Sequence, residues 1–185
     1  MPKISAQASR ERRANIMNAA RRCFVRSGIH ISVDDICAEA GVSKGALYGY
    51  FPSKEAVIQA IADEHVSDLS RVRESKSAGE LIAALLERLG DSRTSGRLEL
   101  EAWAYSLKNE KLRNRLFENA TELRSSITQA LENIGKERIS GAPSLAEAAL
   151  LIETVAMGLV ARAALGEEAE AERVLSLVIS GIVRD

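Results

Sequence analysis

The sequence lacks the features that mark several classes of protein. No uncharged run approaches the roughly 20 residues needed to span a bilayer, because Glu147, Glu153 and Arg162 interrupt the apolar C-terminal region. Residues 1–13 are polar and basic rather than apolar, so no secretory leader is visible. These absences predict a cytoplasmic protein with no membrane partner.

Cysteine and histidine are too scarce to suggest catalysis. Cys23 and Cys37 fall on apolar faces of predicted helices, which favours reduced core residues over a redox role. His30 and His65 lie 35 residues apart, and the sequence has no Gly-x-Ser-x-Gly, His-Glu-x-x-His or phosphate-binding glycine loop. We therefore predict no catalytic residue, no metal ligand and no cofactor, and an enzyme is the less favoured class.

The charged residues that are present are unevenly distributed. The whole chain carries a net charge of −1, with 46% apolar and 28% charged residues, as in an ordinary globular protein. Residues 1–54 hold nine Lys or Arg against four acidic residues, a net charge of +5, whereas residues 55–185 hold sixteen against twenty-two, a net charge of −6. A basic segment of this kind is typical of proteins that contact nucleic acid phosphates.

Residues 32–51 carry the pattern of two short helices joined by a tight turn. Ser32 can cap the first helix, and Gly41 suits a left-handed residue at its end. Ser43 can cap a second helix over about residues 44–50, so the stretch predicts a helix-turn-helix. Apolar residues at helical spacing form the inner face of the first helix: Val33, Ile36, Cys37 and Ala40.

The second of these helices contains residues that an isolated helix disfavours. Lys44 places a positive charge at a helix N-terminus, and Gly45 and Gly49 each cost about 1 kcal/mol relative to alanine. A nearby phosphate would compensate the first penalty, and a face without side chains would let the backbone approach a groove. Alternatively, a seven-residue helix consists mostly of termini, where these residues are tolerated.

Residues 9–69 resemble the DNA-binding domain of the tetracycline-repressor (TetR) family of bacterial transcription regulators. The resemblance rests on Arg13, Ile16, Ala19, Ala20, Phe24, Gly28, Ser32-Val33-Asp34-Asp35-Ile36, Ala40-Gly41-Val42-Ser43, Leu47-Tyr48, Tyr50-Phe51 and Ser53-Lys54-Glu55. It implies an all-α protein of about nine helices, with an N-terminal three-helix DNA-binding domain and a C-terminal helical bundle for ligand binding and dimerisation. The expected division is residues 1–54 for the first domain, 55–74 for a connecting helix and 75–185 for the bundle.

The predicted DNA contacts come from both helices of the motif and from the connecting helix. We expect Gly45 and Ala46 closest to base edges, where the Ala46 methyl could meet a thymine methyl. Leu47 and Phe51 are predicted to be core residues. The resemblance also implies a phosphate contact for Lys54, while Gly49 stands at a position that varies in the family. The predicted DNA-binding residues are Ser32, Ser43, Lys44, Gly45, Ala46, Tyr48, Gly49, Tyr50 and Lys54.

Capping and periodicity predict further helices along the rest of the chain. The first helix of the protein is expected over residues 9–27 and the connecting helix over 54–74. Residues 90–96 are predicted to be a polar break and residues 135–143 a loop. Capping boxes at Ser77 and Ser144 open two of the later helices. The later helices are expected over residues 77–89, 97–108, 109–134, 144–165 and 168–183.

The helix over residues 144–165 is apolar on nearly every side, which predicts burial on every side. We expect one side to pack on its own bundle and the other on a second subunit, the alternative being a core within one chain. The predicted dimer-interface residues are Ala148, Ile152, Val155, Leu159, Leu175, Val178, Ile179 and Ile182. A ligand pocket is expected around His65, Trp103, Tyr105, Phe117 and Met157, each of which could instead be a core residue.

The function predicted from these observations is regulation of transcription. The resemblance implies a repressor that binds a palindromic operator in double-stranded DNA as a homodimer and is released by a small-molecule effector. Two helix-turn-helix motifs held one helical turn apart, about 34–36 Å, would read such a palindrome. The alternative is a helical small-molecule-binding protein that keeps the fold without operator-specific regulation.

Overall fold

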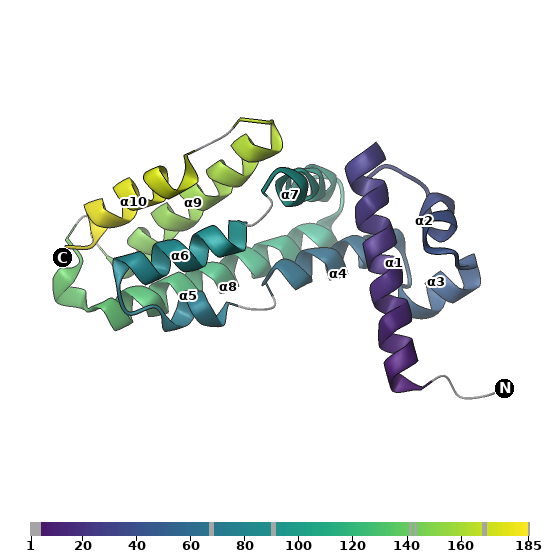
Figure 1. Ribbon diagram of the computed structural model, residues 1–185, viewed down its shortest axis with the longest axis horizontal. Coiled ribbons are helices and arrows are strands. Elements are labelled where there is room, and N and C mark those ends of the chain that lie inside the picture. The colour runs from purple at the N-terminus through teal and green to yellow at the C-terminus, as the bar shows by residue number, and fades with distance from the viewer. Residues whose placement is uncertain are drawn as a thin grey trace.

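A computed structural model describes residues 5–66, 69–89, 92–140, 142, 144–167 and 170–184, apart from the side chains of residues 65, 66 and 92–95. Within these ranges the chain forms ten α-helices, one short 3-10 helix and no strand. The predicted all-α class is confirmed, and the expected number of about nine helices is one too low. The molecule is elongated, with α2 and α3 at one end and the C-terminus at the other (Figure 1).

The first three helices pack around a small apolar centre. α1 spans Ala6–Ser27, α2 Val33–Ala40 and α3 Lys44–Tyr50. α1 begins three residues earlier than predicted because Ser5 caps it, its hydroxyl accepting a hydrogen bond from the Ala8 N–H at 3.1 Å. The side chains of Ile16, Phe24, Ile36 and Leu47 are completely or almost completely buried between these helices.

The prediction of one connecting helix over residues 54–74 is wrong. α4 spans Lys54–Val66 and α5 spans Ser70–Glu74, and Leu69 lies outside both helices. The two segments pack into different cores, which explains the interruption. Val57 and Ile58 of α4 pack with α1–α3, whereas Leu69 and Val72 pack with the C-terminal helices.

The prediction of a polar break at residues 90–96 is also wrong for residues 92–96, the part of it that the structure describes. α6 spans Ala78–Leu89, and α7 spans Ser92–Ser106, so residues 92–96 are helical. Gly96 has a packing role, because a Cβ atom at this position would come within 2.7 Å of the Val160 carbonyl oxygen. The glycine therefore lets α7 lie directly against the backbone of a later helix.

The last three helices complete the C-terminal bundle. α8 spans Glu110–Ile134, α9 Leu145–Ala164 and α10 Ala171–Ile182, close to the predicted ranges. The predicted loop between α8 and α9 contains the 3-10 helix Lys136–Arg138. Isolated bridge pairing between Ile139 and Val183 ties this loop to the end of α10. None of the described helices combines the length and apolar character that crossing a lipid bilayer would require.

Two apolar cores organise these helices. The C-terminal core joins α5, α6, α8, α9 and α10, and includes Leu85, Ile127 and Ile152. The N-terminal core joins α1–α4 but also receives Leu98 and Ala102 from α7 and two leucines from the start of α8. Because α7 and α8 contribute to the N-terminal core, the DNA-binding-like helices rest on the bundle through a continuous apolar contact.

Candidate nucleic-acid interface and ligand cavity

Local hydrogen bonds fix the geometry of the helix-turn-helix. Ser32 and Asp35 form a reciprocal capping box at the start of α2, with the Ser32 N–H donating to Asp35 Oδ2 at 2.9 Å and the Asp35 N–H donating to Ser32 Oγ at 3.2 Å. The Ser32 hydroxyl also donates to Asp35 Oδ2 at 2.7 Å, and this hydrogen bond, followed by the one from the Ser32 N–H, lowers the pKa of Asp35. Gly41 adopts the left-handed conformation at φ 64°, and Ser43 caps α3 by accepting from the Ala46 N–H. The predicted capping roles of Ser32, Gly41 and Ser43 are confirmed.

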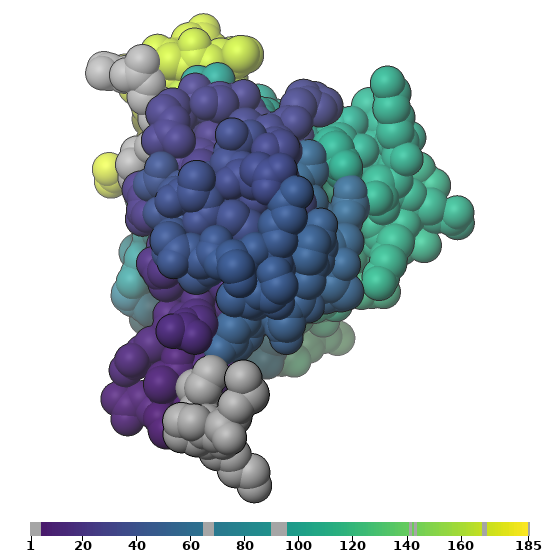
Figure 2. All heavy atoms as spheres, turned by 90° about the vertical axis from the view of Figure 1, so that its right-hand side faces the viewer, coloured from purple at the N-terminus to yellow at the C-terminus, as the bar shows by residue number. Residues whose placement is uncertain are grey.

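One side of α3 faces away from the rest of the molecule. Leu47 is fully buried and Phe51 nearly so, which confirms both as core residues. Four other residues of this helix are exposed: Lys44, Gly45, Tyr48 and Gly49. Ala46 and Tyr50 are partly buried at the edges of the same face. Figure 2 looks onto this end, where α2 and α3 form the surface nearest the viewer.

The two glycines of α3 have no packing role within the described part of the chain. A Cβ atom on Gly49 would meet no atom within 4 Å, and one on Gly45 would meet only the Ser43 hydroxyl at 4.0 Å. Gly96, in contrast, is required by a close helix contact. Because Gly45 and Gly49 carry no side chains and have free space around them, a binding partner could approach the α3 backbone closely here.

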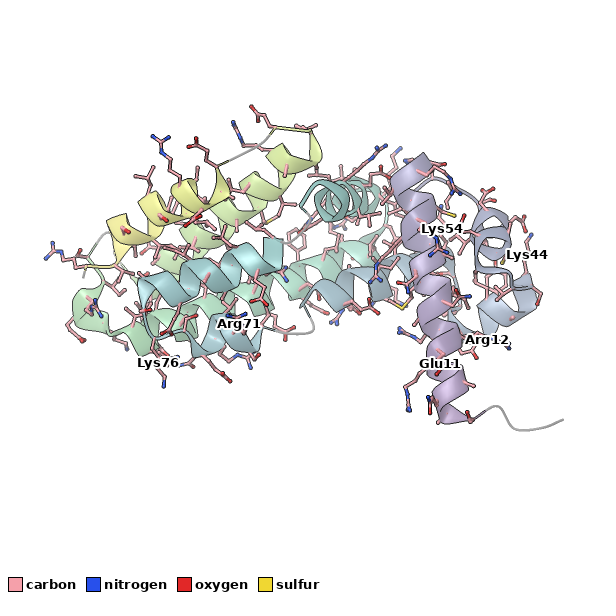
Figure 3. All side chains as sticks on the ribbon, in the orientation of Figure 1. Glu11, Arg12, Lys44, Lys54, Arg71 and Lys76 are labelled. Carbon is pink, nitrogen blue, oxygen red and sulfur yellow. The ribbon has the colours of Figure 1, made fainter. Side chains whose placement is uncertain are left out.

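Lys44 is held by an acidic residue of the neighbouring helix. Its Nζ atom lies 2.8 Å from Asp34 Oδ1, and this hydrogen bond and charge raise the pKa of Lys44. Both side chains are more than half exposed, and Lys44 projects from the outer end of the molecule (Figure 3). Asp34 thus offsets the unfavourable charge of Lys44 at the start of α3 in the absence of any partner.

Lys54 is hydrogen-bonded within the chain. Its ammonium donates to the carbonyl oxygens of Ile29 at 3.0 Å and Ile31 at 3.1 Å, and it lies 5.3 Å from the centre of the Tyr105 ring. These contacts hold the connection between α1 and α2 against α4. The phosphate contact that the resemblance implies for Lys54 stays a prediction.

Several of the basic residues that gave the N-terminal segment its charge are paired within the chain. Arg22 and Arg26 both contact the Glu39 carboxylate, at 2.7 and 3.2 Å, which lowers the pKa of Glu39. Arg21 pairs with Glu64 of α4. Arg12, on the N-terminal half of α1 that projects beyond the other helices, is exposed (Figure 3). The basic charge therefore serves partly to tie α1 to α2 and α4.

Polar contacts join α7 to the DNA-binding-like helices. The Ile29 N–H donates to the Glu101 carboxylate, beside Gly28 at the end of α1. The Tyr105 hydroxyl donates to Glu55 Oε1 at 2.6 Å, linking α7 to the first turn of α4. This hydrogen bond raises the pKa of Tyr105 to about 12 and lowers the pKa of Glu55. These two hydrogen bonds therefore tie α7 to the connection after α1 and to α4.

The Tyr105→Phe variant should measure the strength of this link. We expect its free energy of unfolding at pH 7 to fall by about 1.5–3 kcal/mol, the range for hydrogen bonds to charged groups. Because the pKa of Tyr105 is higher in the folded state, the contribution is complete below pH 10 and is lost as the pH rises through about 12. Chemical denaturation at pH 7 and in that alkaline range would test both expectations, with the exposed Tyr48→Phe as control. Equal stability of the two variants would contradict the assignment.

A cavity of about 70 Å³ lies beside this link, between the N-terminal helices and the bundle. Phe24 and Ile29 reach it from the end of α1 and the connection that follows, and Trp103 from α7. Of the sixteen described residues that line it, twelve are apolar and four are polar or charged: Arg88, Glu99, Asn119 and Glu153. A cavity of this composition suits a largely apolar small molecule with a polar group.

The predicted pocket residues are only partly brought together. Trp103 and Met157 line the cavity. Tyr105 is directed to Glu55 instead, and Phe117 is 55% exposed and packs edge-on against Trp103 at 5.6 Å between ring centres. The side chain of His65 lies outside the described residues. Tyr105 and Phe117 are therefore not part of the cavity wall.

The predicted dimer-interface residues lie mostly inside one chain. Six of them are buried by the chain's own helices: Ala148, Ile152, Leu159, Leu175, Ile179 and Ile182. Val155 and Val178 are partly buried. A side chain already removed from solvent cannot be covered again by a second subunit, so these six belong to the C-terminal core. The residues that α9 and α10 leave exposed are instead Leu150, Leu151, Thr154, Gly158, Leu177 and Gly181, together with Ala146, Glu147, Arg162, Glu172, Arg173 and Ser180.

Sequence reasoning missed the charged residues of the cavity. Glu153 is only 3% exposed, and Arg124 of α8 contacts it at 2.5 Å between Nε and Oε2. A single carboxylate within the apolar run of residues 145–165 was the signal that could have identified Glu153. No comparable signal marked Arg88 or Glu99, because charged residues are ordinary in helices such as α6 and α7.

Family models match most of the chain. The model described as "Bacterial regulatory proteins, tetR family" matches residues 16–61, which contain the helix-turn-helix. The model described as "BetI-type transcriptional repressor, C-terminal" matches residues 76–184, more than half of the chain.

Individual proteins and structures agree with these matches. The chain is 28% identical over 183 residues to the HTH-type transcriptional repressor AcnR of Corynebacterium diphtheriae, covering 96% of this chain and 95% of AcnR. It is 45% identical over 64 residues to UidR of Escherichia coli K12, a match to 34% of this chain and 33% of UidR. The structure of Salmonella enterica GusR superposes over the full length of both chains with a TM-score of 0.78 and 25% identity. The chain therefore belongs to the tetR family of bacterial transcriptional regulators.

Proposed function

We propose that this regulator is a repressor that binds a palindromic operator in double-stranded DNA as a homodimer and is released by a small-molecule effector. The observation that carries the proposal is the exposed face of α3, which presents Lys44, Tyr48 and two glycines and has open space around Gly49. The similarity to AcnR, whose name describes a transcriptional repressor, favours repression over activation.

The proposed DNA surface consists of α3 and the turn before it. Gly45 and Gly49 allow the α3 backbone to approach the major groove, with Ala46 at the edge of the contact. Lys44 and Ser43 contact phosphates, and Tyr48 and Tyr50 contact phosphate or sugar. Ser32 stays near the backbone of the duplex, although its hydroxyl is already engaged with Asp35. Lys54 supports this surface by holding the connection that precedes α2.

The proposed dimer surface is the exposed face of α9 and α10. Leu151, Gly158 and Leu177 lie on this face, and a Cβ atom on Gly158 or Gly181 would meet nothing within 4 Å. Two copies packed face to face would bury these leucines and place four helices in one bundle. α10 and the C-terminus lie at the end of the molecule remote from α3 (Figure 1). Dimerisation through this surface would therefore leave α3 of both subunits free to bind DNA.

The proposed effector site is the cavity between α4, α7 and α8. Ile58 of α4 and Trp103 of α7 line it. Lys54 of α4 and Glu101 of α7 both hydrogen-bond to the connection between α1 and α2. A ligand that separates α4 from α7 would change the position of α3 relative to the dimer axis. The distance between the two α3 helices of the dimer would change with it. Equal operator affinity for free and ligand-saturated protein would contradict this coupling.

Selection of bound sequences from random duplex DNA would identify the operator, and Lys44→Ala would then test the proposed surface. We expect weaker binding to all sequences and a salt dependence shallower by about one unit of slope, because one phosphate contact is lost. Asp34→Asn is the complementary variant, since it changes the net charge by one unit in the opposite direction and frees Lys44 from its partner, and it should strengthen binding. Retention of the wild-type salt slope in Lys44→Ala would remove Lys44 from the interface. Failure to bind any duplex at low salt would favour a ligand-binding protein without operator regulation.

A further inference from the structure

The arginines of α1 differ in what they contact. In the C-terminal half of the helix, carboxylates of α2 and α4 pair with the arginines. In the N-terminal half, Arg10 and Arg12 are exposed, and no residue in the described ranges gives either of them a hydrogen bond, an ion pair or a ring contact. Glu11, which lies between them in the sequence, accepts a hydrogen bond from the Gln7 side chain at 3.1 Å. The positive charges of Arg10 and Arg12 are therefore available to an external partner.

Two contacts show which side of α1 faces α3. The Asn15 amide donates to the Ala40 carbonyl oxygen at the end of α2, at 2.9 Å. The Arg13 guanidinium lies 5.0 Å from the centre of the Phe51 ring, directly after α3. Because an α-helix turns once every 3.6 residues, the Arg12 side chain leaves α1 between the directions of Asn15 and Arg13. Arg12 therefore projects on the side of α1 where the helix-turn-helix lies.

The N-terminal half of α1 extends beyond the apolar core. Ile16 is the first residue of α1 that belongs to the N-terminal core, so residues 6–15 carry the helix past it. Figure 2 looks onto the end of the molecule where α2 and α3 lie, and the N-terminal part of α1 continues along the edge of this end. Arg12 and Lys44 both lie at this end (Figure 3). Exposed positive charge is thus carried here by two different helices.

A duplex that accepts α3 in its major groove would bring phosphates close to Arg12. The groove is about 12 Å wide, so a phosphate backbone runs roughly 6 Å to either side of a helix at its centre. Neighbouring helices in proteins pack about 8–10 Å apart, which places α1, beside the end of α3, near one of these backbones. The arginine guanidinium is a planar fork of N–H donors that matches the oxygens of a phosphate. Arg12 thus has the position and the chemistry for a backbone contact.

We propose that the N-terminal half of α1 is a second DNA-contacting surface, on which Arg12 donates to a backbone phosphate beside the groove that α3 enters. The inference rests on the proposed function, because it takes α3 as the helix in the groove. It also extends that function, since the DNA surface described there consists of α3 and the turn before it. A phosphate contact carries no sequence information, so Arg12 adds affinity for every duplex while α3 selects among sequences. Arg13 acts as a positioning residue, because its contact with Phe51 holds α1 beside α3.

Salt-dependent binding to double-stranded DNA would test this contact. The probe is a fluorescein-labelled duplex of mixed sequence and about 30 base pairs, long enough for two contacts one helical turn apart. Fluorescence anisotropy with the full-length protein, at several KCl concentrations, gives the affinity and the salt slope. We expect Arg12→Gln to weaken binding about tenfold, the lower end of the range for a hydrogen bond to a charged group. The salt slope should become shallower by about 0.9, because one phosphate contact is lost.

Arg10→Gln is the matched control, since it removes the same charge from the same exposed half of α1. At 3.6 residues per turn the two arginines leave the helix about 160° apart, so Arg10 does not share the contact. Its change in salt slope should be less than half of that in Arg12→Gln. Arg12→Lys should keep most of the slope, because the charge remains, and lose part of the affinity, because the planar fork is lost. Both arginines are exposed, so the variants should fold, and circular dichroism would check their helix content.

Two results would overturn the inference. These are a wild-type salt slope in Arg12→Gln, and equal changes in Arg10→Gln and Arg12→Gln, which would reflect only the net charge of α1. An unchanged slope in Arg12→Gln beside a shallower one in Lys44→Ala would reject the α1 contact and leave the proposed function standing. The expected Arg12 effect in a protein that selects no sequence from random duplexes would reject operator regulation alone. A wild-type protein that binds no duplex at low salt would reject both.

Discussion

The Leu177→Arg variant should be monomeric and should lose operator binding by at least about 100-fold. Leu177 of α10 is 68% exposed in the single chain and lies on the proposed dimer surface. A two-fold interface contains each residue twice, so the substitution would place two unpaired guanidinium groups in an apolar contact. Burial of an unpaired charge costs more than the roughly 2.7 kcal/mol that corresponds to a 100-fold change in affinity. Sedimentation velocity and a DNA retardation assay would measure the two effects.

A matched variant separates loss of the dimer from a general effect of exposed charge. Leu107→Arg changes a leucine that is 75% exposed just after α7, outside α9 and α10. We expect this variant to remain dimeric and to bind the operator. Dimeric Leu177→Arg with normal operator affinity would show that the exposed face of α10 is not the interface, and Leu151→Arg would then test α9 separately.

The Arg124→Met variant should lower the free energy of unfolding by about 3 kcal/mol. It leaves the Glu153 carboxylate, which is 3% exposed, without the guanidinium that contacts it. Loss of one partner from a buried pair typically costs about 3–5 kcal/mol, and the lower end applies because the Arg124 side chain is 39% exposed. Urea denaturation would give the value directly.

Two further variants distinguish this buried pair from ordinary surface charges. The double variant Arg124→Met with Glu153→Leu removes both charges and should recover most of the lost stability, since an apolar replacement of a buried pair is often neutral. Arg173→Met breaks an exposed pair with Glu170 and should cost less than about 1 kcal/mol. A similar loss in Arg124→Met and Arg173→Met would contradict the role assigned to Glu153.

The cavity lies where the N-terminal and C-terminal cores meet. Phe24 and Ile29 belong to the N-terminal core, yet they share the cavity wall with Met157 of α9. An effector would therefore touch the DNA-binding domain itself as well as the bundle. The hydrogen bonds from Tyr105 to Glu55 and from the Ile29 N–H to Glu101 lie beside this contact and link α7 to the N-terminal helices.

The helix-turn-helix could be predicted from sequence because its geometry depends on interactions between near neighbours. Ser32 and Ser43 each accept a hydrogen bond from the backbone three residues later, and Gly41 adopts a conformation that other residues rarely take. The burial of Leu47 and Phe51 follows from the periodicity of a short helix with one inner face. Interactions of this kind involve residues that are close together in the sequence. They can be recognised without knowing the rest of the fold.

Long-range packing decided what the sequence left open. Helical periodicity marked α9 and α10 as apolar, but only the arrangement of α6 and α8 around them determined that Ile152 and Leu175 are inside while Leu177 is outside. Lys54 finds its partners at Ile29 and Ile31 only because α4 packs against the α1–α2 connection. The cavity likewise combines residues from position 24 to position 157. The sequence by itself determined most of the helices and the helix-turn-helix. Tertiary packing decided that α4 and α5 are separate helices, that α7 begins at Ser92 and which faces and charges meet, because contacts between distant segments depend on the relative placement of whole helices.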